Sequence, residues 1–228
     1  MSTERKPITI YGQTSSPDLS SLQILLKELG IAYNGPKAPS ADEKEHLDYL
    51  VVNAEGGEPC IQDPNTQTVL GEIGAVFEYL VSNYDKDHRV IFRRGTPEFW
   101  LAKQWLCFHV AVQAPVFRQA QWFKTSQSRE EKLFGGATGR FIQEVQRVTA
   151  VLESQLAKQE QKYPGSGGPW VVGDKLSFVD LALISWQTKI GTILEKDEYD
   201  GTKYPHLQSW IDRLTSLPSM QQFCRYGS

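Results

Sequence analysis

The first third of the chain opens with a short apolar run and a regularly spaced set of leucines. Residues 8–12 (ITIYG) predict a strand that ends in glycine. Apolar side chains then recur at i, i+3, i+4 and i+7, which predicts an amphipathic helix; they are Leu22, Leu25, Leu26 and Leu29. We expect Ser16 to cap this helix, Pro17 to take its first position and Gly30 to end it.

A second group of short elements follows this helix. Residues 31–34 predict the start of a second strand, and residues 35–44, rich in Pro, Ala and Ser, predict a loop. The segments 60–63 (CIQD) and 68–70 (TVL) flank the turn PNTQ, which predicts a β-hairpin. Residues 74–84 predict a helix. This strand and helix order predicts a small α+β sheet layered with helices.

The rest of the chain has helical periodicity almost throughout. A long aromatic stretch runs from Phe99 to Phe123 and is interrupted by Pro115. Ser177 and Asp180 have capping-box spacing ahead of an apolar run, with Asp in place of the usual Glu or Gln. Two further stripes predict amphipathic helices; they are Phe141, Val145, Val148, Leu152 and Leu156, and then Leu207, Trp210, Ile211 and Leu214.

These patterns predict two domains. We expect an α+β domain over residues 1–84, a charged linker over 85–96 and an all-helical domain over 97–228. A length of 228 residues suits one large domain or two small ones.

Composition narrows the kinds of partner. The formal net charge is -3 and no Lys/Arg cluster occurs, so we expect no nucleic-acid partner. No stretch approaches the roughly 20 apolar residues of a membrane helix. Residues 1–7 are polar and lack the apolar region of a secretory signal, so a cytoplasmic location is expected. Cys60, Cys107 and Cys224 are too few and too far apart for a disulfide framework or a metal site, and we expect mostly buried, reduced thiols.

Five segments resemble glutathione S-transferases, in the right order and at the right spacing. Three are similar to the fungal nitrogen-regulator-like (Ure2-type) class: YGQTSSPDLSSLQILLKELGIAYN (11–34), NAEGGEP (53–59) and LGEIGAVFEYL (70–80). Two are similar to motifs of the whole superfamily: WVVGDKLSFVDLALISW (170–186) and YPHLQSWIDRLTSLPSMQ (204–221). The resemblance implies a thioredoxin-like N-terminal domain, an all-helical C-terminal domain, glutathione as cofactor and a homodimer.

The loop ahead of the first helix is where such a protein activates a thiol. A free cysteine thiol has a pKa near 8.5, and the positive end of a helix dipole lowers it. The resemblance implies that Ser15 donates a hydrogen bond to the glutathione sulfur, although it also suits a plain loop residue. Asp18 replaces an asparagine of the class; it would raise the pKa of a nearby thiol, or simply complement the helix dipole. No cysteine lies in residues 14–17, so glutathione itself would supply the nucleophile.

The resemblance also assigns the residues that would hold the tripeptide. Pro59 would follow a cis peptide bond, so that the backbone of Glu58 pairs with the cysteinyl unit of glutathione as an added strand. Glu72 would receive the γ-glutamyl ammonium, and the N–H of Ile73 its carboxylate. Because Ile73 replaces a serine hydroxyl, we predict binding weaker by about ten- to hundredfold. His46 would meet the glycyl end, or is a solvated loop residue.

The second substrate would lie against the helical stretch at 99–123. Phe108, Val112, Phe117 and Trp122 are candidates for an apolar pocket, although an aromatic stripe also suits an ordinary core. Members of the class form carbon–sulfur bonds in detoxification and in natural-product pathways, and the pseurotin-type member isomerises a double bond from trans to cis by reversible thiol addition. The sequence therefore predicts a glutathione-dependent transferase or isomerase of a small apolar electrophile. A non-catalytic binding or regulatory protein is the alternative.

Overall fold

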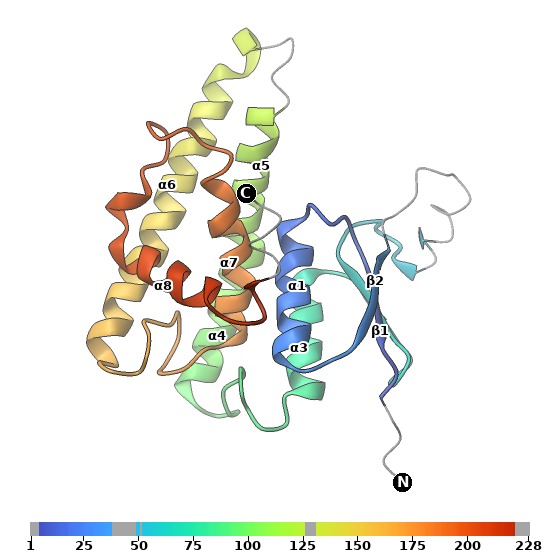
Figure 1. Ribbon diagram of the computed structural model, residues 1–228. Coiled ribbons are helices and arrows are strands. Elements are labelled where there is room, and N and C mark those ends of the chain that lie inside the picture. The colour runs from blue at the N-terminus through green and yellow to red at the C-terminus, as the bar shows by residue number, and fades with distance from the viewer. Residues whose placement is uncertain (1–4, 38–48, 51, 126–130, 222–228) are drawn as a thin grey trace. The chain divides into compact units, whose positions relative to one another are not determined.

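The computed structural model describes the chain in four stretches, residues 5–37, 49–50, 52–125 and 131–221 (Figure 1). The chain divides into two compact units, residues 1–88 and residues 89–228.

The first unit is built on a mixed four-stranded sheet. Its strands are β1 (Ile8–Tyr11), β2 (Tyr33–Lys37), β3 (Cys60–Asp63) and β4 (Thr68–Leu70), in the order β2-β1-β3-β4. β1 pairs in parallel with β2 and antiparallel with β3, and β3 forms the predicted hairpin with β4. The structure confirms the α+β thioredoxin-like half. The helices α1 (Pro17–Glu28) and α3 (Ile73–Tyr84) lie on one face of the sheet (Figure 1).

The second strand is longer than the sequence indicated. It includes Gly35 and Pro36, which the composition had placed in a loop. β2 lies at the edge of the sheet, where Pro36 is tolerated although it has no N–H to donate to a neighbouring strand. The register shifts between Thr9 and Tyr11, opposite this dipeptide. Gly35 has φ +105°, and an added β-carbon would lie 2.6 Å from the backbone oxygen of Ile10. Only glycine therefore fits at this position.

The caps predicted for the first helix are confirmed. The N–H of Leu19 donates to Ser16 Oγ at 3.4 Å, and Pro17 occupies the first turn. The helix ends at Glu28 with Leu29 as its C-cap, and Gly30 follows in the left-handed region at φ +66°. The predicted leucine stripe is buried, which fixes the position of the loop before the helix.

A buried carboxylate ties the hairpin to α3. Asp63 Oδ1 accepts hydrogen bonds from the N–H of Asn65 at 2.8 Å and from its side-chain amide at 2.9 Å. Asp63 Oδ2 accepts from the hydroxyls of Tyr79, at 2.6 Å, and Tyr84. Burial alone would raise the pKa of Asp63, but the hydrogen bonds from Tyr79, Tyr84 and Asn65 bring it below its ordinary value.

This depressed pKa predicts an acid-sensitive contribution to stability. The unfolded chain binds the proton first as the pH falls, so the stability that Asp63 provides is present above about pH 4 and is lost as the pH drops through its lowered folded pKa. We expect Asp63→Asn to be less stable than wild type at pH 7 and to approach it below about pH 4. Urea unfolding over this range measures the gap, and a gap that stays constant with pH would contradict the prediction.

The second unit is all-helical, as the sequence predicts. Its helices are α4 (Pro97–Phe108), α5 (Ala114–Thr125), α6 (Glu131–Lys162), α7 (Phe178–Ile190) and α8 (Pro205–Thr215), with a 3₁₀ turn η2 at Gly201–Lys203. The interruption expected near Pro115 is a π-helical turn, η1 (His109–Gln113). The N–H of Ala114 donates to the oxygen of His109, five residues back. Pro115 has no N–H to donate. The wider π-helical turn before it allows the helical path to continue from α4 into α5 instead of ending.

Part of the segment expected as a linker is packed. Val90, Ile91 and Phe92 are buried. The oxygen of Val90 accepts from the N–H of Phe178 at 2.9 Å, and that of Ile91 from Lys175 Nζ at 3.0 Å. These residues therefore belong to the second unit rather than to an open linker.

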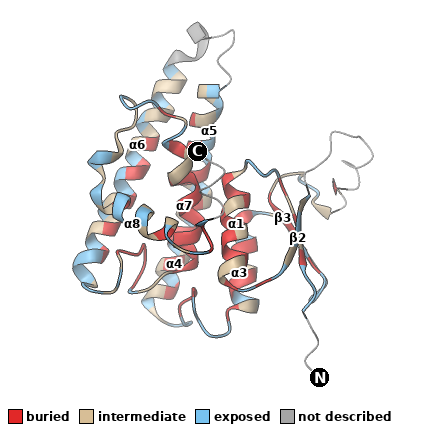
Figure 2. Ribbon diagram, viewed as in Figure 1, coloured by how far each residue is buried: buried red, intermediate tan, exposed pale blue. Residues whose placement is uncertain are grey.

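The start of α7 is held by the predicted capping box. Asp180 is fully buried. Its Oδ2 accepts from the N–H and the hydroxyl of Ser177, at 2.9 and 2.7 Å. Its Oδ1 accepts from the N–H of Val171 at 2.8 Å and from Trp210 Nε1 of α8 at 2.9 Å. α7 is buried along most of its length (Figure 2). One carboxylate thus joins α7, the segment before it and α8.

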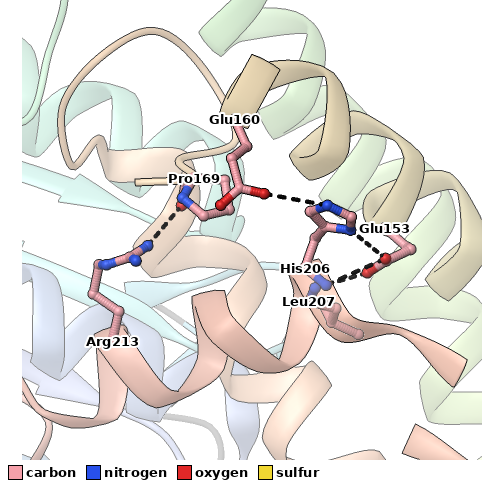
Figure 3. Close-up of polar contacts among 6 residues, drawn as sticks. All are labelled: Glu153, Glu160, Pro169, His206, Leu207 and Arg213. Atoms are coloured by element: carbon pink, nitrogen blue, oxygen red, sulfur yellow. Dashed lines mark hydrogen bonds and ion pairs between the residues drawn. The ribbon is translucent and has the colours of Figure 1, made fainter. Parts of the chain in front are cut away.

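The start of α8 is capped by a residue from another helix. Its own N-cap residue, Tyr204, makes no side-chain cap bond. Glu153 of α6 accepts instead from the N–H groups of His206 at 3.2 Å and Leu207 at 2.7 Å. The His206 ring lies between Glu153 and Glu160, with Nδ1 2.7 Å from the first carboxylate and Nε2 3.2 Å from the second (Figure 3).

Loss of this cap should loosen α8. Glu153→Ala removes both acceptors of the helix N–H groups, and we expect the free energy of unfolding to fall by about 2 kcal/mol. Glu160→Ala, which removes only the more exposed partner of His206, should cost under about 1 kcal/mol. Chemical unfolding of the two variants checks this ranking, and equal losses would show that the cap is not the main contribution of Glu153.

Candidate functional site

Three segments of the first unit form the candidate site. They are the loop that leads into α1, the segment before β3 and the turn into α3. Gln13 of the first segment contacts Glu58 of the second, and Asn53 bridges the second to Gly71 of the third. The structure therefore brings Ser15, Asp18, Glu58, Pro59, Glu72 and Ile73 to one region of this unit.

The loop before α1 places one expected residue in solvent and another in the interior. Ser15 is exposed. Asp18 lies in the first turn of α1 and is only 2% exposed. The backbone oxygen of Asp18 accepts a hydrogen bond from Ser21 Oγ at 2.8 Å. This loop therefore offers an exposed hydroxyl, while an acidic side chain is buried just behind it at the positive end of a helix.

The segment before β3 carries the expected cis bond between Glu58 and Pro59. Pro59 is buried and Glu58 is half-buried. The Glu58 carboxylate accepts a hydrogen bond from the N–H of Gln13. β3 begins only at Cys60, so the backbone of Glu58 extends this edge without being part of the sheet. An extended peptide can pair with such a segment as an added strand.

Two residues that the sequence did not single out hold this segment in place. The oxygen of Gly57 accepts from the Tyr49 hydroxyl at 2.5 Å and from Asn53 Nδ2 at 2.7 Å. The Asn53 amide also lies against Gly71, where an added β-carbon would come within 3.1 Å of Asn53 Nδ2. The signal for Asn53 was its match to the first asparagine of the family segment; Tyr49 had no such signal.

The turn into α3 holds its acidic residue in a costly conformation. Glu72 has φ +61°, in the left-handed region, and its side chain does not cap α3. Non-glycine residues in sparsely populated conformations cost about 1–3 kcal/mol each and occur often at binding sites. Ile73 is the first residue of α3 and its side chain is buried, so it offers a backbone N–H and no polar group. This arrangement suits an ammonium at Glu72 and a carboxylate at the N–H groups that open the helix.

The remaining residues expected at the site lie in the second unit or outside the described residues. His46 lies outside the described residues. In the second unit, Phe117 is fully buried in a cluster that includes Trp186, its ring centroid 6.3 Å away. Phe108 and Val112 are half-buried against the same cluster. Trp122 is 53% exposed. Phe117 therefore has the position of a core residue, whereas Trp122 presents an apolar surface.

The structure describes two of the three cysteines, and Cys224 lies outside the described residues. Cys60 is buried, and burial raises the pKa of its thiol. Cys107, on α4, is exposed, so the expectation of a buried thiol is met at Cys60 and not at Cys107. Over the stretches that the structure describes, no group of three His, Cys, Asp or Glu side chains is placed to hold a metal ion. Within the same stretches no helix has the length and apolar character needed to span a membrane.

Comparisons with known proteins agree with this geometry. Residues 120–226 match the family model described as "Glutathione S-transferase, C-terminal domain". The glutathione S-transferase-like protein tpcF of Aspergillus fumigatus is 42% identical over 218 residues, which cover 95% of this chain and 94% of tpcF. The glutathione S-transferase-like protein gedE of Aspergillus terreus is 41% identical over 211 residues, 92% of this chain and 91% of gedE.

A solved structure is similar over the whole chain. The glutathione transferase URE2P8 of Phanerochaete chrysosporium, crystallised with oxidized glutathione, has a TM-score of 0.83 at 26% identity, covering 100% of this chain and 97% of its own. The sheet, the helical unit and the site together define a protein with the glutathione transferase fold. The chain belongs to the glutathione S-transferase family, with relatives of the fungal Ure2 type.

Proposed function

We propose that this protein is a cytoplasmic, glutathione-dependent enzyme that acts on a small apolar electrophile in fungal secondary metabolism. The reaction is conjugation, or reversible thiol addition that isomerises a double bond. Glutathione supplies the nucleophilic sulfur, and the protein binds and orients it.

Asn53 donates to the oxygen of Gly57 and lies against Gly71, the residues that precede Glu58 and Glu72, and this arrangement carries the proposal. The cysteinyl unit pairs with the backbone of Glu58, and the γ-glutamyl ammonium meets Glu72. Its carboxylate then meets the N–H of Ile73, where the helix dipole favours negative charge. These contacts direct the sulfur toward Ser15 and the start of α1, which lowers the pKa of a bound thiol.

Retention on immobilised glutathione, followed by turnover that depends on added thiol, tests the proposal. We expect retention and turnover with conjugated electrophiles, and weak activity on a generic chloronitrobenzene. Failure to be retained, together with no thiol-dependent turnover, would overturn it.

The alternative is a binding or regulatory protein without catalysis. The buried side chain of Ile73 favours it, because the first residue of α3 presents no hydroxyl to the γ-glutamyl carboxylate. Retention on glutathione without turnover of any electrophile would select this alternative.

We also propose a homodimer. Trp100 is 66% exposed and Cys107, two helical turns further along α4, is exposed as well. An exposed indole of this size is a common interface residue. Light scattering at twice the chain mass of 25.8 kDa is the expected result, and a mass of one chain would contradict it.

A further inference from the structure

The side chain of Glu58 has a position that its backbone role does not require. The family segment has valine at this position, and pairing with a peptide needs only backbone atoms. In this structure the Glu58 carboxylate turns back onto the loop before α1 and accepts the N–H of Gln13. The two residues are 45 positions apart in the chain, so this contact joins two of the three segments of the site.

The backbone of the loop is shaped to receive this carboxylate. Gly12 has φ +149°, and an added β-carbon there would lie 3.1 Å from Glu58 Oε2 and 3.3 Å from Leu19 Cδ1. A side chain at position 12 would therefore displace the carboxylate or the core leucine. Ser16, the cap of α1, donates its N–H to the oxygen of Gln13 at 3.0 Å. Gln13 therefore contacts both Glu58 and Ser16, so that one residue links the Glu58 carboxylate to the cap of α1.

The charge has a chemical consequence as well. The proposed function directs the glutathione sulfur toward the loop that carries Gln13, and the N–H of Gln13 already donates to the Glu58 carboxylate. A negative charge next to an ionising thiol opposes its ionisation, and a difference of about one pKa unit is a tenfold change. Asp18, buried in the first turn of α1, adds a second acidic group behind the same loop.

We propose that Glu58 is a positioning residue that fixes the loop before α1 through Gln13 and, by its charge, partly offsets the effect of the α1 start, so that the thiol of bound glutathione is more protonated than an uncharged side chain at position 58 would leave it. This inference rests on the proposed function, because it concerns glutathione in the same site. The charge of Glu58 makes the thiol of bound glutathione less ionised than it would be beside the valine of the family segment. The site is then selective for electrophiles reactive enough to need little thiolate.

Four proteins test this inference: wild type, Glu58→Gln, Glu58→Asp and Glu55→Gln. Glu58→Gln keeps an oxygen to accept the Gln13 N–H but removes the charge. Glu58→Asp keeps the charge. Glu55→Gln removes an equal charge from an exposed position of the same segment and is the matched control. The ultraviolet absorbance of the glutathione thiolate is titrated against pH for each complex, and calorimetry measures glutathione affinity.

We expect Glu58→Gln to raise the thiolate fraction about tenfold at a given pH below the thiol pKa, a shift of about one unit. Glu58→Asp and Glu55→Gln should titrate within about a third of a unit of wild type, because neither removes the charge at Gln13. The inference is overturned when Glu58→Gln titrates as wild type does, or when Glu55→Gln shifts equally.

Calorimetry separates this result from a failure of the proposed function. No heat of glutathione binding to wild type would overturn the proposed function, and the inference with it. Binding to wild type with coincident thiol titrations would overturn the inference alone. Thermal unfolding of each variant confirms that only folded protein is compared.

Discussion

Asp180→Asn is expected to lower the free energy of unfolding by about 3 kcal/mol, because it replaces the acceptor of four buried hydrogen bonds with an amide that leaves at least one buried donor unpaired. Each carboxylate oxygen accepts two donors: Val171 N–H and Trp210 Nε1 meet Oδ1, and the N–H and hydroxyl of Ser177 meet Oδ2. An asparagine offers one acceptor oxygen and one amino group. An amino group at the Oδ1 position faces two donors and loses both hydrogen bonds. At the Oδ2 position it loses at least the bond from the Ser177 N–H, while the Ser177 hydroxyl can accept instead.

Urea unfolding of Asp180→Asn beside Asp174→Asn measures this effect. Asp174 is an exposed acidic residue in the loop just before the capping box, so its loss should change stability by less than about 0.5 kcal/mol. A loss below about 1 kcal/mol for Asp180→Asn would mean that the carboxylate is not the junction of α7, α8 and the preceding segment.

Glu72→Gln is expected to weaken glutathione binding by about ten- to hundredfold. The substitution keeps the size of the side chain but removes the charge that the γ-glutamyl ammonium would meet, and such a charged hydrogen bond is worth about 1.5–3 kcal/mol. Calorimetry with glutathione measures the affinity. Asp87→Asn, an exposed position of the same unit, is the control and should bind as wild type does.

A second substitution at the same position separates strain from binding. Glu72 has φ +61°, which glycine adopts without steric cost, so Glu72→Gly should raise stability by about 1 kcal/mol while it weakens binding. Reduced stability in this variant would show that the Glu72 side chain supports the fold rather than the ligand. Unchanged affinity in both variants would remove Glu72 from the site.

Local patterns predicted the elements whose formation depends on nearby residues. The leucine stripe, the Ser16 cap and the Ser177–Asp180 capping box lie within one or two helical turns, so spacing alone revealed them. The strand β2 extends past its prediction because its Gly-Pro pair is tolerated only at a sheet edge, and edge position depends on strand order. The π-helical turn was visible only as a disturbance near Pro115.

The contacts that assemble the candidate site depend on distant residues. Resemblance indicated Glu58, Pro59, Glu72 and Ile73 individually. It did not indicate that the Glu58 side chain returns to Gln13, because the family segment has no acid there. Tyr49 was likewise missed, since its hydrogen bond to Gly57 joins two positions eight residues apart that no sequence motif relates. Periodicity also could not separate Phe117, a core residue, from Trp122, which is exposed; only packing distinguishes them.

The central claim is that glutathione docks its backbone beside Glu58, with its γ-glutamyl end at the start of α3. Amide NMR of the full chain during a glutathione titration tests this most directly. The account predicts that the amide signals of Glu58 and Ile73 move together along one saturating curve, with Gln13 among the signals that follow. Saturating glutathione that leaves both signals in place would contradict it, whatever shifts occur elsewhere in the protein.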